Sequence, residues 1–523
     1  MPDLRDDQAD ALDALRDAVR DNKRRICMQA PTGWGKTVLT CALVESARQR
    51  GKKVLFTVPA ISLVDQTYEM FVSHGITEVG VIQATNPLYD WAQPIQIASV
   101  QTLMKRERPL ADIVLIDECH IWFDYYGKWM GTHDHRPPPW DTVPFIGLSA
   151  TPWRKGLGSW YDHFHKASTT QEMINAGHLS PFRVFAPSHP DLSNVRTVAG
   201  DFHEGELSAA MQEGRLVADA VETWIKLAEN RPTLCYGVDR AHAKALMTKF
   251  QAAGISCAYQ DAYTKDADRI DKATGERVPG RKAIKTGFHD GTYKVVCNVG
   301  TLTTGIDWDV RCISMCRPTK SDMLFVQIVG RGLRTAPGKD DCLILDHSDN
   351  HLRLGFATAI DESYTGLHDG KSPQHSNRTD NIKLPKECPK CAYLKPPRMA
   401  ECPSCGFVAQ VISKIKSEAG ELHEMTRETR MLKPPPPDPL VVETMEDKAL
   451  FFSELKYYCA RQGYAPGWAS HKYKEKTGVW PNHPMIKHAP LAKWIRPETV
   501  NYIKSRFIAH ANRRRDEGGY ART

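Results

Sequence analysis

The octapeptide Ala30–Thr37, A-P-T-G-W-G-K-T, constrains the fold of this chain more than any other stretch. A short apolar run, Ile26–Met28, comes directly before it, and an amphipathic stretch, Val38–Arg48, follows it. A strand, a glycine-containing turn and a helix in this order are what a phosphate-binding loop requires. The helix start adds the positive end of its dipole to the backbone N–H groups of the turn. The octapeptide therefore predicts an anion site between a strand and a helix.

Each residue type in this loop has a physical use. Two glycines, Gly33 and Gly35, let the backbone curl so that several N–H groups point at one anion. Lys36 can reach the terminal phosphates, and the Thr37 hydroxyl can ligate Mg²⁺. Ala30 departs from the usual pattern, which has glycine there. The candidate nucleotide-binding residues are Arg5, Gln8, Ala30, Pro31, Thr32, Gly33, Trp34, Gly35, Lys36 and Thr37, with Gln8 offering an amide that could read an adenine edge.

Buried strands and an acidic pair follow the loop. Apolar runs alternate with helical patterns, which predicts a parallel sheet covered on both faces. These runs are Val54–Val58, Ile95–Ala98, Ile113–Ile116 and Phe145–Leu148. The stretch 113–120, I-V-L-I-D-E-C-H, places Asp117, Glu118 and His120 at a strand end, where open sheets bind ligands. We expect Asp117 to hold Mg²⁺ through water and Glu118 to orient or deprotonate the water that attacks a γ-phosphate.

A second α/β pattern begins near residue 188. It includes an apolar run, Thr233–Val238, a helix, Ala241–Ala253, and another strand, Tyr293–Val299. Residues 327–334 then read Q-I-V-G-R-G-L-R, in which Arg331 and Arg334 share a helix face and can bracket a phosphate. This half has no phosphate loop of its own, so one nucleotide is expected between two lobes.

The remaining sequence predicts smaller units. Cys388, Cys391, Cys402 and Cys405 form two C-x-x-C turns, which fit a structural tetrahedral zinc. The last part, Phe451–Thr523, has 14 Lys and Arg against 5 Asp and Glu, with interleaved aromatic residues that suit nucleic acid. The stretch Trp122–His135 is rich in aromatic residues; we favour a packed insertion over a base-stacking surface or a His/Asp metal cluster.

Composition limits the class of protein. The chain has 523 residues, 41% hydrophobic and 25% charged, and a net charge of +7. No apolar run approaches the ~20 residues that span a membrane, and the polar N-terminal stretch is not a secretory signal. We therefore expect a cytoplasmic protein without membrane association. Cysteines that lie singly in apolar runs, such as Cys27 and Cys235, are expected to be reduced.

The expected architecture is α/β: two tandem parallel-sheet lobes, a zinc ribbon and a basic, helical C-terminal domain. The expected boundaries are 1–187 for the first lobe, 188–362 for the second, 363–385 for a linker, 386–412 for the ribbon, 413–445 for a charged and proline-rich linker, and 446–523 for the last domain.

These motifs together resemble the superfamily 2 helicases and translocases of the D-E-x-H branch. Ser149–Pro152 matches the S-A-T motif of that group, which by resemblance couples hydrolysis to movement. The resemblance implies catalytic roles for Lys36, Asp117, Glu118, His120, Gln327, Arg331 and Arg334, and a ribose contact for Gly305 and Asp307. It implies nucleic-acid contacts for Pro59, Ser62, Gln66, Ser99, Gln101, Thr102 and Thr303, whose groups suit phosphate oxygens.

The order of lobes and four-cysteine ribbon looks most like RadD-type and related bacteriophage helicases. That resemblance implies RecA-like lobes in an ATP-, Mg²⁺- and zinc-dependent DNA helicase of a bacterial cell or phage-infected host. It implies a monomer that acts on branched or recombination intermediates and works with recombination or replication proteins. The motifs leave three alternatives open: an RNA helicase, a duplex translocase that does not separate strands, and the motor subunit of a restriction complex. A fourth, from another class, is a nucleic-acid-binding scaffold with a vestigial ATPase.

Overall fold

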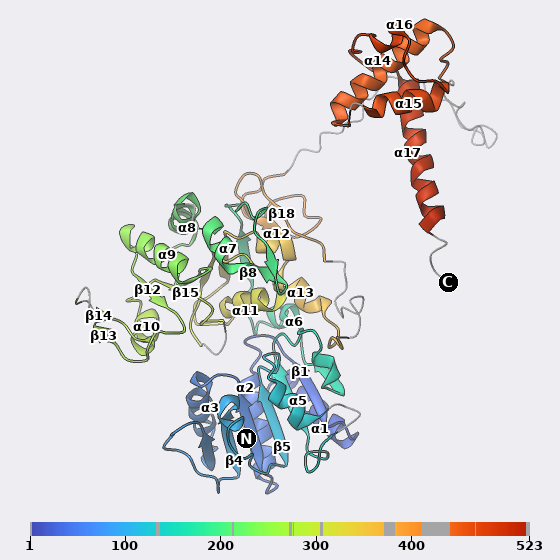
Figure 1. Ribbon diagram of the computed structural model, residues 1–523. Coiled ribbons are helices and arrows are strands. Elements are labelled where there is room, and N and C mark those ends of the chain that lie inside the picture. The colour runs from blue at the N-terminus through green and yellow to red at the C-terminus, as the bar shows by residue number, and fades with distance from the viewer. Residues whose placement is uncertain are drawn as a thin grey trace, which may run out of the picture. The chain divides into compact units, whose positions relative to one another are not determined.

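The computed structural model describes residues 3–131, 136–211, 214–270, 275, 277–303, 307–370, 382–408, 440–465 and 467–518. The chain divides into two compact units, Met1–Val411 and Ile412–Thr523 (Figure 1). The first unit contains two parallel sheets and a small ribbon, and the second is helical. Gly305 and the proline-rich stretch 433–439 lie outside the described residues.

The first lobe is a seven-stranded parallel sheet in the order β3-β4-β2-β5-β6-β1-β7. Its strands are β1 (Arg25–Gln29), β2 (Val54–Val58), β3 (Val79–Ile82), β4 (Ile95–Ser99), β5 (Ile113–Asp117), β6 (Phe145–Ser149) and β7 (His163–Lys166). Its helices are α1 (Asp6–Arg20), α2 (Lys36–Arg48), α3 (Ser62–Ser73), α4 (Val100–Leu103), α5 (Asp124–Met130) and α6 (Thr170–Asn175), with a 3-10 turn at Leu157–Ser159. Every residue of β1, β2, β4 and β6 is buried, which explains their apolar runs.

The second lobe is a six-stranded parallel sheet in the order β12-β15-β11-β16-β17-β8. Its strands are β8 (Phe182–Phe185), β11 (Thr233–Tyr236), β12 (Cys257–Gln260), β15 (Val295–Asn298), β16 (Cys312–Met315) and β17 (Cys342–Asp346). Its helices are α7 (Glu204–Met211), α8 (Gly214–Leu227), α9 (Arg240–Ala252), α10 (Arg281–His289), α11 (Asp322–Gly332), α12 (Asn350–Leu354) and α13 (Ala357–Ser363). Short hairpins are formed by β9 (Thr197–Val198) with β10 (Asp201–Phe202), and by β13 (Arg269–Ile270) with β14 (Arg277–Val278).

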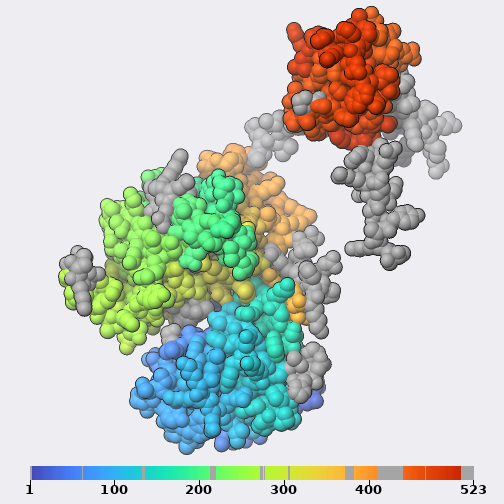
Figure 2. All heavy atoms as spheres, in the orientation of Figure 1, coloured from blue at the N-terminus to red at the C-terminus, as the bar shows by residue number. Residues whose placement is uncertain are grey.

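Two expected boundaries need correction. Strand β8 pairs with β17 of the second sheet, so the second lobe begins before residue 188. The stretch 363–370, expected as the start of a linker, instead packs back onto the first lobe. Tyr364 stacks on Trp153 at 4.2 Å between ring centroids, and Ser159 Oγ donates to Asp369 O at 2.7 Å. Figure 2 shows the side chains of the two lobes in direct contact.

The aromatic stretch after the acidic pair is packed inside the first lobe. Tyr126 and Trp129 of α5 are 1% and 0% exposed. Trp129 meets Phe145 edge-on, with 5.0 Å between ring centroids. This confirms the packed insertion for the described part, and these two rings cannot serve as a base-stacking surface. The His/Asp pair of a metal cluster, at 133–135, lies outside the described residues.

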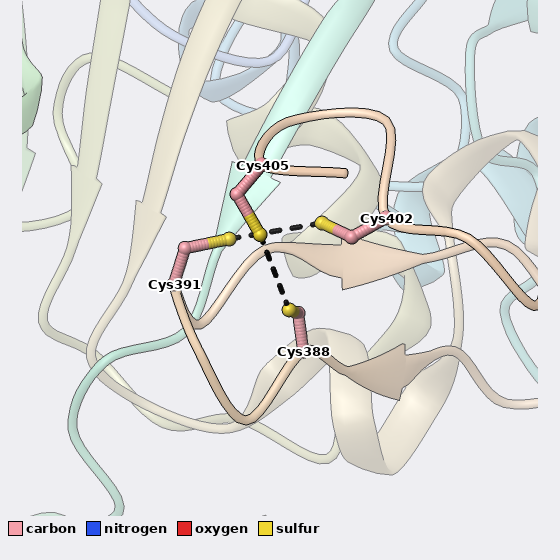
Figure 3. Close-up of side chains that lie close together, drawn as sticks. All are labelled: Cys388, Cys391, Cys402 and Cys405. Atoms are coloured by element: carbon pink, nitrogen blue, oxygen red, sulfur yellow. Dashed lines mark hydrogen bonds between the residues drawn. The ribbon is translucent and has the colours of Figure 1, made fainter. Parts of the chain in front are cut away.

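The cysteine ribbon is attached to the second lobe. Its strands, β18 (Lys386–Glu387) and β19 (Leu394–Lys395), pair antiparallel. Figure 3 shows the four cysteine side chains pointing toward one centre. The Ala186 N–H donates to the Ala392 carbonyl at 2.9 Å, and Tyr393 meets Phe185 edge-on at 5.3 Å. The end of β8 therefore supports the ribbon.

The second unit contains α14 (Met445–Gln462), α15 (Gly467–Thr477), α16 (Pro484–Lys487) and α17 (Pro497–Gly518). Its core is formed by side chains that are at most 1% exposed, namely Phe451, Leu455, Tyr473 and Ile503. All fourteen cysteines lie in described parts of the chain and have free thiols. In those parts, no helix combines the length and apolarity needed to cross a bilayer.

Candidate functional site

The predicted phosphate loop is formed between β1 and α2. Gly33 and Gly35 have φ of +85° and +101°, in the left-handed region that L side chains rarely adopt. A Cβ at Gly35 would lie 2.4 Å from Gln8 Nε2, so a side chain there would displace the Gln8 amide from the loop. Lys36 Nζ donates to the carbonyls of Ala30 at 2.9 Å and Pro31 at 3.3 Å, which places the ammonium inside the loop.

Arg5 and Gln8 hold this loop from outside. Arg5 donates to Trp34 O at 2.7 Å, and Gln8 Nε2 donates to the same carbonyl at 3.0 Å. Gln8 Oε1 also accepts from Arg5 N at 3.2 Å. The Trp34 ring is fully buried. Both ends of the Gln8 amide therefore position the loop, and its contact with adenine stays a prediction.

One cavity of about 590 Å³ lies against the loop and is lined by both lobes. The predicted residues that line it are Thr32, Gly33, Gly35, Lys36, Thr37, Gln66, Asp117, Glu118, Asp307, Arg331 and Arg334. Sequence reasoning missed eight further lining residues, namely Val38, Thr40, Phe56, Leu63, Thr67, Met70, His178 and Thr335. The cavity thus brings the loop lysine, the acidic pair and the arginine pair together, although 295 residues separate Lys36 from Arg331 in the sequence.

The charged groups in the cavity perturb one another. Burial lowers the pKa of Lys36, and the neighbouring Glu118 and Asp117 partly offset this effect. Burial, together with the charge of Glu118, raises the pKa of Asp117 to about 7. Burial lowers the pKa of Arg331 to about 10. Perturbed groups of this kind gather where a site is built to bind or react.

The acidic pair also fits a hard cation. Glu118 has φ of +47°, a strained angle for this residue type. Its buried Oε2 accepts no hydrogen bond within the described residues, although His120 Nδ1 lies 3.3 Å away. An unsatisfied buried carboxylate oxygen is costly, and Mg²⁺ prefers oxygen ligands. Asp117 and the Thr37 hydroxyl line the same cavity, so the residues present suit Mg²⁺.

A hydrogen-bond network behind the acidic pair joins the two lobes. His120 Nδ1 lies 2.8 Å from Ser149 Oγ, and Gln327 Nε2 lies 3.0 Å from His120 Nε2. Gln327 Nε2 also donates to Thr151 Oγ at 2.9 Å. Burial lowers the pKa of His120, which favours a neutral ring that donates from Nδ1 and accepts at Nε2. The network therefore connects α11 with the ends of β5 and β6.

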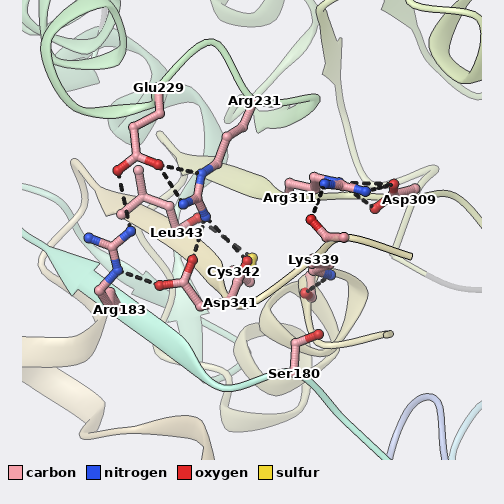
Figure 4. Close-up of polar contacts among 12 residues, drawn as sticks. Ser180, Arg183, Glu229, Arg231, Asp309, Arg311, Lys339, Asp341, Cys342 and Leu343 are labelled. Atoms are coloured by element: carbon pink, nitrogen blue, oxygen red, sulfur yellow. Dashed lines mark hydrogen bonds and ion pairs between the residues drawn. The ribbon is translucent and has the colours of Figure 1, made fainter. Parts of the chain in front are cut away.

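The end of α11 is held so that its two arginines face the cavity. Arg331 Nε donates to Thr303 O at 2.8 Å, and Arg334 donates to Asp307 Oδ1 at 2.7 Å. Lys339 Nζ donates to Gly332 O at 2.6 Å and to Arg334 O. Lys339 and Ser180 (Figure 4) both donate to Arg334 O. Lys339 also satisfies the carbonyl of Gly332, the last residue of α11.

Comparison with known proteins agrees with this arrangement. Residues 1–154 match the family model described as "Type III restriction enzyme, res subunit". The "51.5 kDa protein" of Lactococcus phage (isolate 7-9) is 27% identical over 418 residues, covering 78% of this chain and 83% of the phage protein. A Saccharomyces cerevisiae protein named as an ATP-dependent helicase, IRC3, is 28% identical over 66% of this chain, which spans about half (51%) of that protein. Together these matches support a superfamily 2 ATPase of the helicase type.

The fold of this helicase is also found in a solved structure. A fragment assigned as an HsdR subunit of a type I restriction enzyme from Vibrio vulnificus YJ016 superposes with a TM-score of 0.50. The superposition covers 69% of this chain and 68% of that fragment, at 20% sequence identity. At this identity the likeness concerns the fold.

The predicted nucleic-acid contacts of the helicase differ in their accessibility. Ser99 is fully buried, and its hydroxyl caps α4 by accepting from Thr102 N at 3.3 Å. Gln101 Nε2 donates to Pro59 O at 2.6 Å. Thr303 is 7% exposed, and Gln66 lines the nucleotide cavity. The side chain of Ser62 lies outside the described residues. Direct phosphate contacts by this group of residues stay predictions.

A second connection between the lobes was not predicted from the sequence. The Asp361 carboxylate, 2% exposed, accepts from Gln29 Nε2 at 2.8 Å, and from Thr170 N and Oγ at 2.6 and 2.8 Å. Lys166 Nζ lies 3.5 Å from the same carboxylate. Gln29 is the last residue of β1 and immediately precedes the phosphate loop. The polar side chain of Gln29, directly after the apolar run Ile26–Met28, was the one hint that this position has a buried partner.

The four thiols of the helicase ribbon fit zinc. All four Sγ atoms lie within 4.8 Å of one another. The pairs Cys388–Cys405 and Cys391–Cys402 are each separated by 3.7 Å. A tetrahedron with Zn–S bonds of about 2.3 Å has S···S edges of about 3.8 Å, whereas a disulfide bond is about 2 Å long. The geometry therefore suits one four-coordinate metal and excludes disulfide pairing.

Proposed function

We propose that this helicase hydrolyses ATP to move along DNA and separate its strands, with branched or recombination intermediates as its substrates. The observation that supports this proposal is the shared cavity, which Lys36 lines from the first lobe and Arg331 and Arg334 line from the second. The finer similarity to RadD-type helicases motivates the choice of DNA.

The proposed chemistry uses groups that already face this cavity. The N–H groups of the loop and Lys36 bind the phosphates, and Thr37 and Asp117 hold Mg²⁺, which neutralises phosphate charge when bound. Glu118 orients the attacking water, and the two arginines stabilise the charge that develops on the γ-phosphate. Asp307 and Gly305 contact the ribose. Structural zinc is bound by the four cysteines and stabilises the ribbon.

Hydrolysis is coupled to movement through the contacts between the lobes. The γ-phosphate draws Arg331 and Arg334 toward Lys36 and closes the cavity. Gln327 transmits the change at the acidic pair through His120 and Thr151, which it contacts across the lobes. Release of phosphate reopens the cavity, and the lobes alternate their grip on the backbone.

ATP turnover by purified full-length protein tests the site. Lys36→Ala and Glu118→Gln should each reduce hydrolysis at least ~100-fold, since each removes a group that acts on the transition state. Lys52→Ala is the matched control, because this lysine lies after α2, 53% exposed and paired with Asp112. Wild-type turnover by Lys36→Ala would refute the site.

A stimulation panel tests the substrate. We expect branched DNA to stimulate ATP hydrolysis more than single-stranded DNA, duplex DNA or RNA, all compared at one salt concentration because phosphate contacts are salt-dependent. Strongest stimulation by RNA would refute the DNA assignment and leave the ATPase assignment intact.

A second candidate is a motor subunit of a restriction complex, which the family match of residues 1–154 favours. Such a motor would travel on duplex DNA without separating the strands. Displacement of a triplex-forming strand from an intact duplex, without release of either duplex strand, would identify this activity.

A further inference from the structure

Three aromatic rings form a partly exposed stack on the second unit. The Tyr464 ring lies 5.1 Å from that of Trp468, and the Trp468 ring stacks on Phe507 at 6.4 Å. The Tyr458 ring also stacks on Trp468, with 5.6 Å between ring centroids. Tyr464 and Phe507 are each 40% exposed. We call Tyr464, Trp468 and Phe507 the ring surface.

The ring surface is assembled from three separate elements. Tyr464 follows α14, Trp468 is in the first turn of α15, and Phe507 is in α17 (Figure 1). Trp468 also packs against the core of the unit, so it has a structural role. Tyr464 and Phe507 add little to that core, because two fifths of each side chain faces water. Exposed aromatic faces grouped in this way mark an interaction site.

Positive charge lies one helical turn from the rings. Arg461 follows Tyr458 by three positions in α14, Lys472 follows Trp468 by four in α15, and Lys504 precedes Phe507 by three in α17. Residues at these spacings share a helix face. Arg461 and Lys504 are exposed, and Lys472 is paired with Glu475 at 2.6 Å. Residues 451–523 carry 14 basic against 5 acidic side chains, an excess that complements a polyanion.

Aromatic faces flanked by cations match one class of partner. A single-stranded nucleic acid offers unpaired bases that stack on rings and a phosphate backbone that neutralises Lys and Arg. A duplex hides its base faces, and an acidic protein offers no planar groups at regular spacing. We propose that Tyr464, Trp468 and Phe507 bind single-stranded nucleic acid by base stacking, without nucleotide in the lobes. This site is separate from the cavity and gives the motor proposed above a second hold on its substrate.

Photocross-linking locates the contact in the intact protein. Full-length protein without ATP is irradiated with single-stranded oligonucleotides that carry 5-iodouracil, as DNA in one arm and RNA in the other. Cross-linked peptides that contain Tyr464, Trp468 or Phe507 are expected. Cross-links confined to the first unit in both arms would overturn the proposal, and the stronger arm identifies the polymer.

Paired substitutions then measure the contribution of the rings. Tyr464→Ala with Phe507→Ala should weaken binding of single-stranded oligonucleotide about 5- to 100-fold, the loss expected when base stacking is removed. Both side chains are partly exposed, so the core formed by Phe451 and Tyr473 is retained. Trp494→Ala is the matched control, because this tryptophan is 66% exposed in the same unit and outside the ring surface. Equal losses in the double variant and in Trp494→Ala would overturn the proposal.

A charge variant guards against a folding artefact. Arg461→Glu with Lys504→Glu alters exposed side chains only and should weaken single-strand binding and flatten its salt dependence. Basal ATP hydrolysis without oligonucleotide should stay at the wild-type level in every variant of the ring surface. If the wild-type protein hydrolyses no ATP in the absence of oligonucleotide, the proposed function is refuted. The binding of oligonucleotide would still test the ring surface in that case. Unchanged affinity and salt slope in the charge variant would count against the proposal.

Discussion

Replacement of Asp361 by alanine tests whether the contact of α13 with the first lobe contributes to the stability of the protein. Its carboxylate receives three hydrogen bonds, from Gln29 and from the backbone and side chain of Thr170, at 2.6–2.8 Å. All three donors belong to buried residues of the first lobe. Asp361→Ala leaves these donors without an acceptor and also removes a negative charge 3.5 Å from Lys166 Nζ.

The expected loss follows from these contacts. An orphaned buried donor costs about 1–3 kcal/mol, and water that enters the small space left by the carboxylate recovers part of it. We therefore expect local stability to fall by about 3–5 kcal/mol, which is about two to four orders of magnitude in hydrogen-exchange protection. Asp361→Asn should cost less, because its one oxygen can still accept from Thr170 while Gln29 loses its acceptor.

Hydrogen exchange is the appropriate assay, because a chain of several lobes does not unfold in two states. Protection is measured in peptides that cover α13 and β1, in the full-length protein. Glu362→Ala is the matched control, since Glu362 is the exposed neighbour of Asp361. Protection of Asp361→Ala within tenfold of the wild type, or an equal loss in Glu362→Ala, would refute the reasoning.

Four further predictions concern single contacts. Gln327→Ala removes two hydrogen bonds between the lobes and should lower the kcat of stimulated ATP hydrolysis about tenfold, with the KM for ATP within about twofold; an unchanged kcat would contradict it. Lys339→Met leaves the Gly332 carbonyl at the end of α11 without its donor and should lower kcat about three- to tenfold, whereas Lys52→Ala should not. Cys391→Ser should reduce bound zinc from one equivalent to a small fraction, measured by elemental analysis after dialysis. Burial lowers the pKa of His347 to about 4, so its neutral form stabilises the fold at neutral pH, and this stability is lost as pH falls from about 6.5 toward 4. Between pH 7 and 5 the loss should be about 2 kcal/mol, and protection in β17 peptides of His347→Asn should be less pH-dependent.

Local sequence patterns predicted much of the fold because their causes are local. Buried parallel strands read as apolar runs, and Val54–Val58 forms a strand with the predicted bounds. Strand β7, with the sequence H-F-H-K, was missed because its half-buried position at the sheet edge requires no apolar run. Strand β8 was assigned to the wrong lobe, because pairing with β17 depends on residues about 160 positions away.

The sequence alone indicated the chemistry of the candidate nucleotide site, with glycines that free the loop backbone, a lysine, an acidic pair and an arginine pair. It also indicated the metal site of the ribbon, from four thiols at metal-binding spacing. These signals are readable because each depends on a short motif whose residue types are dictated by the ligand. Only the tertiary structure decided which distant groups meet, namely Gln327 with His120, Lys339 with the end of α11, and Asp361 with Gln29. Such contacts provide hydrogen-bond partners for buried polar groups across the two lobes. Many polar residue types could serve as the partner, and therefore no local sequence pattern identifies it.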